Sequence, residues 1–373
     1  MQLHLFNPEN DLALANGDPN FVAPVSARKL ARDLASLPAW WSEPDDLIFE
    51  EKKDYSDVPL TVCAPWGWSA EVKKRFLKAG VSTALLPTDD QIERIRELSH
   101  RRTGISILNA LADDSAYSWQ LPSLPEELFS LSDVERFVEQ NPLSVLKIPW
   151  SSSGKGLHWV DQYPAFNREN WLRPVFEKTG SVMGEVVCDK VLDFAMVFYA
   201  EKNGVVCFRG YSLFETDKRG SYSGNKLLPD DAIVDVLCEY VESAQLLQLQ
   251  LSLCRILSEQ IKGDYVGYLG VDMLVYADRD APGFLLHPCI ELNLRMTMGI
   301  AARLFYDKHT CGGEGIFSII HLARKKGLYD RFLQGDISHP EWSGDRLRTG
   351  CLLLTPVNKH TQYVAVAEMR SAL

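Results

Sequence analysis

Short apolar runs that end in polar turns dominate the first 95 residues. Leu3–Phe6 and Leu60–Ala64 have the pattern of buried strands. A helix is predicted over Ala70–Ala79, because a capping serine precedes it and a glycine follows it. Val81–Leu86 is predicted to be the next strand. This alternation of strand and helix is typical of a small parallel-sheet domain, in which ligands bind beyond the carboxyl ends of the strands.

The rest of the chain changes from a helical to a strand-rich pattern. Residues 91–140 are predicted to be mostly helical. Short strands are then expected at 145–148, 157–160, 181–187, 194–200 and 205–211. Beyond them we expect a long amphipathic helix over 231–262, strands at 270–276 and 284–294 joined by a turn, a helix near 314–327, and a hairpin over 349–368. The chain is therefore predicted to be an α/β protein of several parts.

The composition excludes some classes of protein but does not identify a function. The 373 residues are 46% hydrophobic and 24% charged, as in ordinary globular proteins. The 39 Lys and Arg residues against 50 Asp and Glu give a net charge of −11, which argues against binding to nucleic acid or to an anionic membrane. The 8 cysteines are scattered singly, which favours a reducing compartment. With no membrane-span or signal-peptide pattern, we expect a cytoplasmic protein.

A lysine and a serine-rich loop form the first candidate site. Lys147 interrupts a short apolar strand, and burying its charge is costly unless it faces an anion. The backbone N–H groups of the loop that follows can cradle a phosphate, with Lys155 adding charge. The loop residues are Ser151, Ser152, Ser153, Gly154, Lys155 and Gly156. A hairpin tip with a solvated lysine is the alternative, and the residues alone leave both interpretations open.

Acidic residues in two apolar strands form the second candidate site. Asp272 interrupts one strand, and Glu291 and Asn293 lie two residues apart, so on one face, of the next. If the strands pair, the three side chains form a small set of oxygen ligands that suits Mg²⁺ shared with nucleotide phosphates. Arg295 falls on the same face and can bind a phosphate or carboxylate bidentately. An exposed polar hairpin face is the less favoured alternative, because the carboxylates interrupt apolar runs.

In their order along the chain, these motifs resemble the ATP-grasp superfamily. The resemblance covers most of the chain and implies two α+β subdomains that clamp ATP, preceded by a Rossmann-like parallel-sheet domain. It implies a pre-ATP-grasp domain over 1–100, a lid subdomain with connecting helices over 101–185, a subdomain carrying the metal site over 186–330, and a C-terminal extension over 331–373. The segment 98–101 then opens the connecting helix, where related enzymes often place residues that face nucleotide or substrate.

The resemblance also implies residue roles. Phosphate binding falls to Lys147 and the loop 151–156, and metal binding to Asp272, Glu291 and Asn293, with Mg²⁺ the expected ion and Mn²⁺ an alternative. Arg295 and Lys155 take the catalytic role. The nucleoside is expected to contact Glu185, Val186, Val187, Cys188 and Asp193. Substrate contacts are expected from Asn7, Glu9, Asn10, Trp66, Arg209 and Asn225.

The implied activity is that of a ligase that forms ADP. It would activate a small-molecule carboxylate as an acylphosphate for attack by an amine or a thiol. Two alternatives stay open: an ATP-grasp kinase that phosphorylates a hydroxyl, and a protein that binds ATP without turnover. The oligomeric state is open as well, with a homodimer as one alternative.

Overall fold

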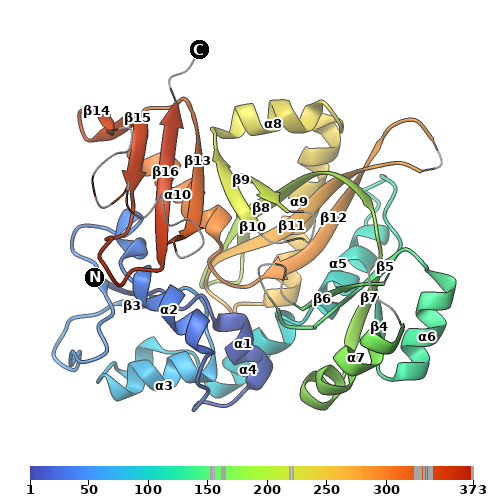
Figure 1. The fold of residues 1–373 in the computed structure, drawn as a ribbon, viewed down its shortest axis with the longest axis horizontal. Helices are drawn as coiled ribbons and strands as arrows, with labels where there is room; N and C mark the ends of the chain where they lie inside the picture. Colours follow the sequence, from blue (N-terminus) through green and yellow to red (C-terminus); the bar gives the residue numbers. More distant parts are fainter. Residues whose placement is uncertain are drawn as a thin grey trace.

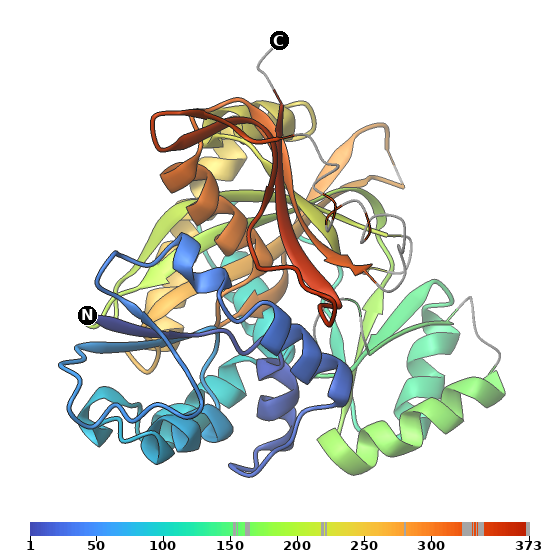
Figure 2. The same ribbon diagram turned by 60° about the vertical axis from the view of Figure 1, so that its left-hand side comes forward.

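Three β-sheets and their covering helices make up the computed structural model, which describes residues 1–151, 154, 156–160, 165–217, 220, 222–279, 281–322, 330, 332, 334 and 339–370. The sheets in this described part have three, nine and four strands. Figures 1 and 2 show them as separate parts of one α/β molecule, with the first sheet beside α1, α2 and α3 and the four-stranded sheet on the opposite side. The predicted α/β class is confirmed.

The N-terminal sheet is parallel, as predicted, but one of its strands differs from the prediction. Its order is β2 (Leu47–Ile48), β1 (Gln2–Leu5), β3 (Val62–Pro65). The strand predicted over 81–86 is wrong: Thr83–Leu85 forms a 3₁₀ turn, η2, in which the Ser82 side chain accepts a hydrogen bond from the Ala84 N–H. Such local side-chain bonds compete with strand pairing. The short strand β2 takes the place beside β1.

Helices cover this sheet and lead to the next. They are α1 (Asn10–Asn16), α2 (Val25–Asp33), η1 (Leu37–Trp40), α3 (Ala70–Lys78), α4 (Asp89–Leu98) and α5 (Arg102–Ala112). The predicted cap of α3 is confirmed, because the Ser69 hydroxyl accepts from the Val72 N–H at 3.3 Å.

The four-stranded sheet carries Lys147 and Glu185. Its order is β4 (Glu126–Leu128), β7 (Val182–Val186), β5 (Ser144–Lys147), β6 (Leu157–Trp159). Helices α6 (Leu131–Gln140) and α7 (Ala165–Thr179) belong to the same part, and a separate small core of residues such as Phe137, Leu146 and Leu172 holds it together. The strands predicted at 145–148, 157–160 and 181–187 are confirmed to within two residues.

The nine-stranded sheet is antiparallel, with the order β12-β11-β8-β9-β10-β13-β16-β15-β14. Its strands are β8 (Asp189–Ala200), β9 (Val206–Thr216), β10 (Tyr222–Leu227), β11 (Gly267–Ala277), β12 (Phe284–Asn293), β13 (Glu314–His321), β14 (Glu341–Ser343), β15 (Arg346–Leu353) and β16 (Tyr363–Arg370). The predicted pairing of 270–276 with 284–294 and the C-terminal hairpin are both confirmed.

Two helix predictions in this region need correction. The helix predicted near 314–327 is wrong over its described part: Glu314–His321 is strand β13, whose β-branched residues pair with both β10 and β16. Residues 323–327 lie outside the described part. The single helix predicted over 231–262 is two helices, α8 (Asp230–Cys238) and α9 (Ser243–Ile261). Val241 lies between them and is buried in the largest core cluster.

The N-terminal sheet contacts the nine-stranded sheet where β12 ends. Gly67 forms an isolated β-bridge with Arg295, and the Met296 N–H donates to the Trp66 carbonyl at 2.7 Å. Helix α10 (Met298–His309) begins directly after this contact. No helix in the described ranges combines the length and apolarity that crossing a bilayer requires.

Candidate active site

A cleft of about 1010 Å³ lies between the three sheets and contains most of the predicted site residues. Those that line it are Glu9, Trp66, Lys147, Ser151, Gly154, Gly156, Glu185, Val186, Val187, Cys188, Asp193, Asn225, Asp272, Glu291, Asn293 and Arg295. Asn7, Asn10 and Arg209 are not among the lining residues. Ser152, Ser153 and Lys155 lie outside the described residues, so their predicted roles stay predictions.

The floor of the cleft is one face of the nine-stranded sheet. Strand register sets Glu291 opposite Asp272, Asp272 opposite Ala195, and Ala195 opposite Ser212, so these four residues form a row across β12, β11, β8 and β9. The row above it consists of His287, Leu274, Asp193 and Phe214. All eight line the cleft. Residues as far apart in the chain as Asp193 and Glu291 therefore share one surface.

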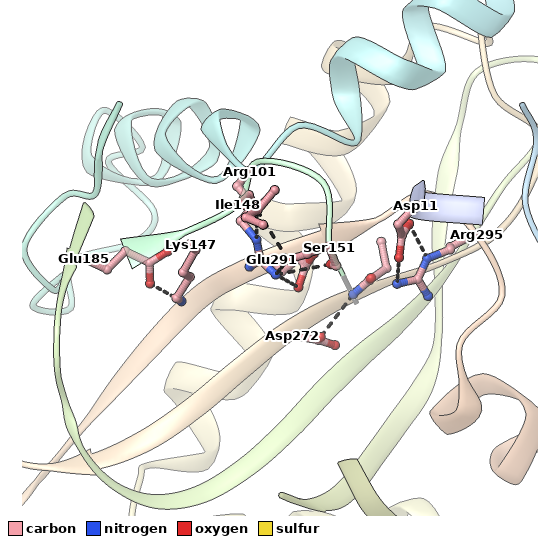
Figure 3. Close-up of polar contacts among 10 residues, drawn as sticks. Asp11, Arg101, Lys147, Ile148, Ser151, Glu185, Asp272, Glu291 and Arg295 are labelled. Carbon is pink, nitrogen blue, oxygen red and sulfur yellow. Dashed lines mark hydrogen bonds and ion pairs between the residues drawn. The ribbon is translucent and has the colours of Figure 1, made fainter. Parts of the chain in front are cut away.

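Lys147 and Glu185 form a buried ion pair at one end of the cleft. They come from neighbouring strands β5 and β7, where Glu185 is two residues along from the residue opposite Lys147. The Lys147 ammonium donates to the Glu185 carboxylate, and the two residues are 8% and 9% exposed (Figure 3). Because an unpaired charge at this depth is costly, each group is the buried partner that the other needs.

Asp272 and Glu291 form the acidic pair predicted from the sequence. They lie directly opposite each other on β11 and β12. Burial, together with the charge of Glu291, raises the pKa of Asp272 to about 7, and burial also raises the pKa of Glu291. The Asn293 amide donates to Asp272 Oδ2 at 3.1 Å, which leaves the amide oxygen of Asn293 for another partner.

The three side chains fit a divalent ion of the magnesium type. Within the described ranges, no group of three or more His, Cys, Asp or Glu side chains is arranged to hold a metal alone. Two carboxylates and one amide oxygen are hard ligands, and they are too few to enclose an ion. Mg²⁺ is typically held in this way, by one or two carboxylates and by phosphate oxygens of a substrate. Asp272, Glu291 and Asn293 would therefore hold the ion with the nucleotide.

Arg101 belongs to the segment 98–101, which was expected to face nucleotide or substrate, but the sequence analysis gave this residue no role of its own. It lies directly before α5, and its guanidinium is 2.9 Å from the Glu291 carboxylate. The same side chain donates to the carbonyls of Ile148 and Ser151, at 3.2 and 3.4 Å (Figure 3). One cation thus connects the acidic pair with the start of the serine-rich loop. Its place at the opening of the predicted connecting helix was the available signal.

Arg295 is held by a residue from the N-terminal part of the chain. Its Nε and Nη2 donate to the two carboxylate oxygens of Asp11 at 2.9 and 2.8 Å (Figure 3). This is the bidentate geometry expected between a guanidinium and a carboxylate. The predicted phosphate or carboxylate partner of Arg295 must therefore share the guanidinium with Asp11 or displace that carboxylate.

Asn7 and Asn10 shape the turn that contacts Arg295. The Asn7 amide donates to the Gly67 carbonyl at 2.9 Å, and the Gly67 N–H donates back to its oxygen at 3.3 Å. With its amide oriented to satisfy the surrounding carbonyls, Asn10 donates to the carbonyls of Gly67 and Trp68, both at 3.1 Å. A Cβ on Gly67 would lie 2.5 Å from the Asn10 side chain, so only glycine fits there. Both asparagines therefore have structural partners outside the cleft surface.

The other predicted substrate residues lie in different surroundings. Arg209 is exposed on β9 and pairs with Glu201 at 3.1 Å, away from the cleft. Asn225 is buried at the cleft wall and donates to the Ser212 hydroxyl at 2.7 Å. Glu9 lines the cleft, and burial raises its pKa.

The predicted nucleoside end of the cleft contains a second residue that was missed. His287 is 4% exposed, lines the cleft, and lies opposite Leu274. Among the described residues no hydrogen-bond partner lies within reach of its Nδ1. Burial lowers the pKa of His287 to about 4, so the imidazole is neutral. Close by, the Asp193 carboxylate accepts hydrogen bonds from Lys190 and Thr216, at 2.6 and 2.7 Å.

Comparison with known proteins gives matches among solved structures only. No family model matches the chain, and the search of curated proteins finds no match. A biotin carboxylase from Campylobacter jejuni, solved as a β,γ-ATP complex, has a TM-score of 0.53 and 10% identity over 100% of this chain and 88% of that chain. N5-carboxyaminoimidazole synthetase from Staphylococcus aureus with ADP has a TM-score of 0.50 and 11% identity, with 99% and 93% covered.

A third match includes magnesium. The biotin carboxylase domain of 2-oxoglutarate carboxylase from Hydrogenobacter thermophilus, solved with MgADP and bicarbonate, has a TM-score of 0.53 and 11% identity, with 100% and 86% covered. The chain therefore has the ATP-grasp fold, and the resemblance suggested by its motifs is confirmed at the level of the fold. The three-stranded parallel sheet is consistent with the N-terminal domain expected before that fold.

Proposed function

We propose that this chain is an ATP- and Mg²⁺-dependent ligase that activates a small-molecule carboxylate as an acylphosphate. One observation carries the proposal: Asp272 and Glu291 face each other on the floor of the same cleft that contains the buried Lys147. Similar structures were solved with ATP-type nucleotides and, in one case, with magnesium and bicarbonate. The same ligand classes suit the charges of this cleft.

The chain's own residues have separable tasks in this proposal. Lys147 and Arg101 bind phosphate oxygens, and Arg295 orients the substrate carboxylate or the transferred phosphoryl group. The hinge 185–188 and Asp193 face the nucleoside. Bound magnesium supplies positive charge that neutralises the triphosphate as charge develops on the leaving group. These side-chain cations already lie in the cleft. To bind the nucleotide, they need only exchange their carboxylate partners for phosphate.

Two displacements make up the reaction. A carboxylate oxygen attacks the γ-phosphorus, an O–P bond forms, and the bond from that phosphorus to the ADP oxygen breaks, which gives acylphosphate and ADP. An amine or thiol then attacks the acyl carbon, phosphate leaves with the bonding pair, and the proton of the nucleophile passes to solvent. No protein nucleophile takes part, and closure of the cleft protects the acylphosphate from water.

The test is an assay with Mg-ATP, a carboxylate library and hydroxylamine. A ligase of this kind yields hydroxamate and ADP. A phosphorylated product without hydroxamate would indicate the kinase alternative, and AMP with pyrophosphate would contradict both. Nucleotide binding without turnover of any library member would indicate a binding protein.

Two variants connect the assay to the site. Glu291→Gln and Lys147→Ala should each reduce turnover at least about 100-fold, since each removes a charge that the proposal places at the transferred phosphoryl group. Arg209→Ala is the matched control, because Arg209 lies outside the cleft. A fully active Glu291→Gln would refute the metal assignment.

A further inference from the structure

The half of the cleft that lies away from Lys147 has apolar walls. Leu30, Trp66, Met298, Ile319 and Tyr363, which we call the apolar chamber, all line the cleft. They come from α2, the turn after β3, the start of α10, β13 and β16. These segments span more than 300 positions of the sequence, and the fold brings their side chains to one surface. Figure 2 shows α2 next to the end of the β13–β16 pair.

The chamber residues border a hydrophobic core on the side that faces the cleft. Trp66 is a buried member of the second core cluster, and the other four residues are half-buried and pack against that cluster. Apolar side chains that remain half-exposed inside a concave site, with polar groups nearby, are characteristic of ligand-binding pockets.

Specific contacts hold the chamber walls in place. The Asp33 carboxylate at the end of α2 accepts from the backbone N–H groups of Gln362 and Tyr363, at 2.7 and 3.2 Å. Tyr363 lies opposite His321 across β16 and β13, and the two rings stack with centroids 4.6 Å apart at 13°. The chamber is therefore a preformed surface, with a flat aromatic platform on one side.

The chamber continues directly from the proposed reaction centre. Met298 is five residues beyond Asn293 and one beyond Thr297, which also lines the cleft. A nucleotide bound between the hinge 185–188 and the acidic pair leaves this half of the cleft for the second substrate.

We propose that the carboxylate substrate carries an apolar group, branched aliphatic or aromatic, which binds in the chamber while its carboxylate faces Arg295. This inference rests on the proposed function and specifies its substrate class. Bicarbonate, which is bound in the similar 2-oxoglutarate carboxylase structure, has no side group for such walls to contact. The chamber distinguishes this chain from a site built for that small anion.

The test measures binding rather than turnover. The full chain is loaded with MgADP, and the affinities of acetate, 3-methylbutanoate and phenylacetate are measured by ligand-observed NMR. We expect at least one of the two larger acids to bind about 10-fold or more tightly than acetate, since each buried methylene adds a sizeable factor in such pockets. If neither larger acid binds more tightly than acetate, or none binds, the inference is overturned.

Three variants test whether the preference for the larger acids arises in the chamber. Leu30→Asp introduces a charge into the chamber and Ala27→Trp fills it from the same face of α2, so both should abolish the preference for the larger acids. Leu247→Asp is the matched control, because Leu247 is 55% exposed on α9 and outside the cleft. A preference that survives both chamber variants would also overturn the inference.

The same samples separate failure of the inference from failure of the proposed function. MgADP should raise the thermal stability of the wild type and of all three variants equally. Intact MgADP binding without any preference for apolar acids would leave the proposed function in place and reject the chamber assignment. Failure of MgADP to bind the wild type would reject the proposed function, and the chamber assignment with it.

Discussion

Arg101 and Glu291 are joined by an ion pair of 2.9 Å, although one precedes helix α5 and the other lies on the edge strand of the nine-stranded sheet. The Arg101 guanidinium is therefore paired with Glu291, one of the two carboxylates proposed as metal ligands. An arriving divalent ion must compete with a fixed cation for that group. In the proposed function, nucleotide phosphates would offer Arg101 a replacement partner, which would couple metal binding to nucleotide binding.

Replacement of Arg101 by methionine should strengthen binding of a metal ion alone. We expect the affinity for Mn²⁺ without nucleotide to rise about fivefold, corresponding to roughly 1 kcal/mol, because the competing charge is gone. Electron paramagnetic resonance titration at pH 8 measures it. Arg102→Met is the control, since Arg102 is exposed and its carboxylate contact is with Glu127 at 3.8 Å. Unchanged or weaker Mn²⁺ binding in Arg101→Met would contradict the competition.

Disruption of the Lys147–Glu185 pair should destabilise the fold. Lys147→Met leaves the Glu185 carboxylate buried without its cation, and such losses typically cost about 3–5 kcal/mol. Urea unfolding monitored by circular dichroism measures the change. The double variant Lys147→Met/Glu185→Leu should recover most of the loss, because neither charge then remains. A double variant no more stable than Lys147→Met would contradict this account.

Loss of the Asp11 carboxylate should loosen the contact between the N-terminal sheet and β12. Asp11→Asn removes the charge from a bidentate pair and should cost about 2 kcal/mol. Hydrogen exchange offers a local measurement, because the Met296 N–H bonded to the Trp66 carbonyl should exchange faster. Asp45→Asn, at an exposed position, is the control. Equal protection of Met296 in Asp11→Asn and the wild type would argue against this coupling.

The raised pKa of Asp272 predicts a pH-dependent stability difference. Its pKa is about 7 in the folded chain against an ordinary value of 3.8, because burial disfavours the charged form. The folded state thus binds more protons than the unfolded state between these values, and stability falls as the pH rises from about 4 to about 7. Asp272→Asn lacks this titration, so it should gain stability relative to wild type over that interval. Unfolding curves at pH 4.5 and pH 7.5 measure the difference, and a constant difference would refute the shift.

The site could be predicted from sequence where charges interrupt apolar strands. Lys147, Asp272 and Glu291 each replace an expected hydrophobic residue, and the cost of burying them points to a ligand. Arg101 and His287 gave no such signal. Arg101 lies at a helix boundary, where charged residues are common, and the importance of His287 depends on a burial that only the packed sheets create.

Secondary-structure predictions were wrong where an element was very short or where distant strands determined its structure. Strand β2 has two residues, too few to show alternation, and it exists because β1 offers a parallel edge. Strand β13 follows a glycine-rich segment that resembles a helix entry, yet two neighbouring strands supply its hydrogen bonds. The break between α8 and α9 carries no glycine or proline, so periodicity alone favours one helix.

The position of β16 in the sequence matters for chains whose synthesis stops early. Tyr363 is on this strand, whereas Leu30 and Trp66 are more than 290 residues earlier in the chain. A ribosome that has made residues 1–300 has already produced Lys147, the hinge and the acidic pair, but not the last wall of the chamber. A premature stop before residue 363 would thus produce chains with every proposed nucleotide ligand and an unfinished site for the second substrate.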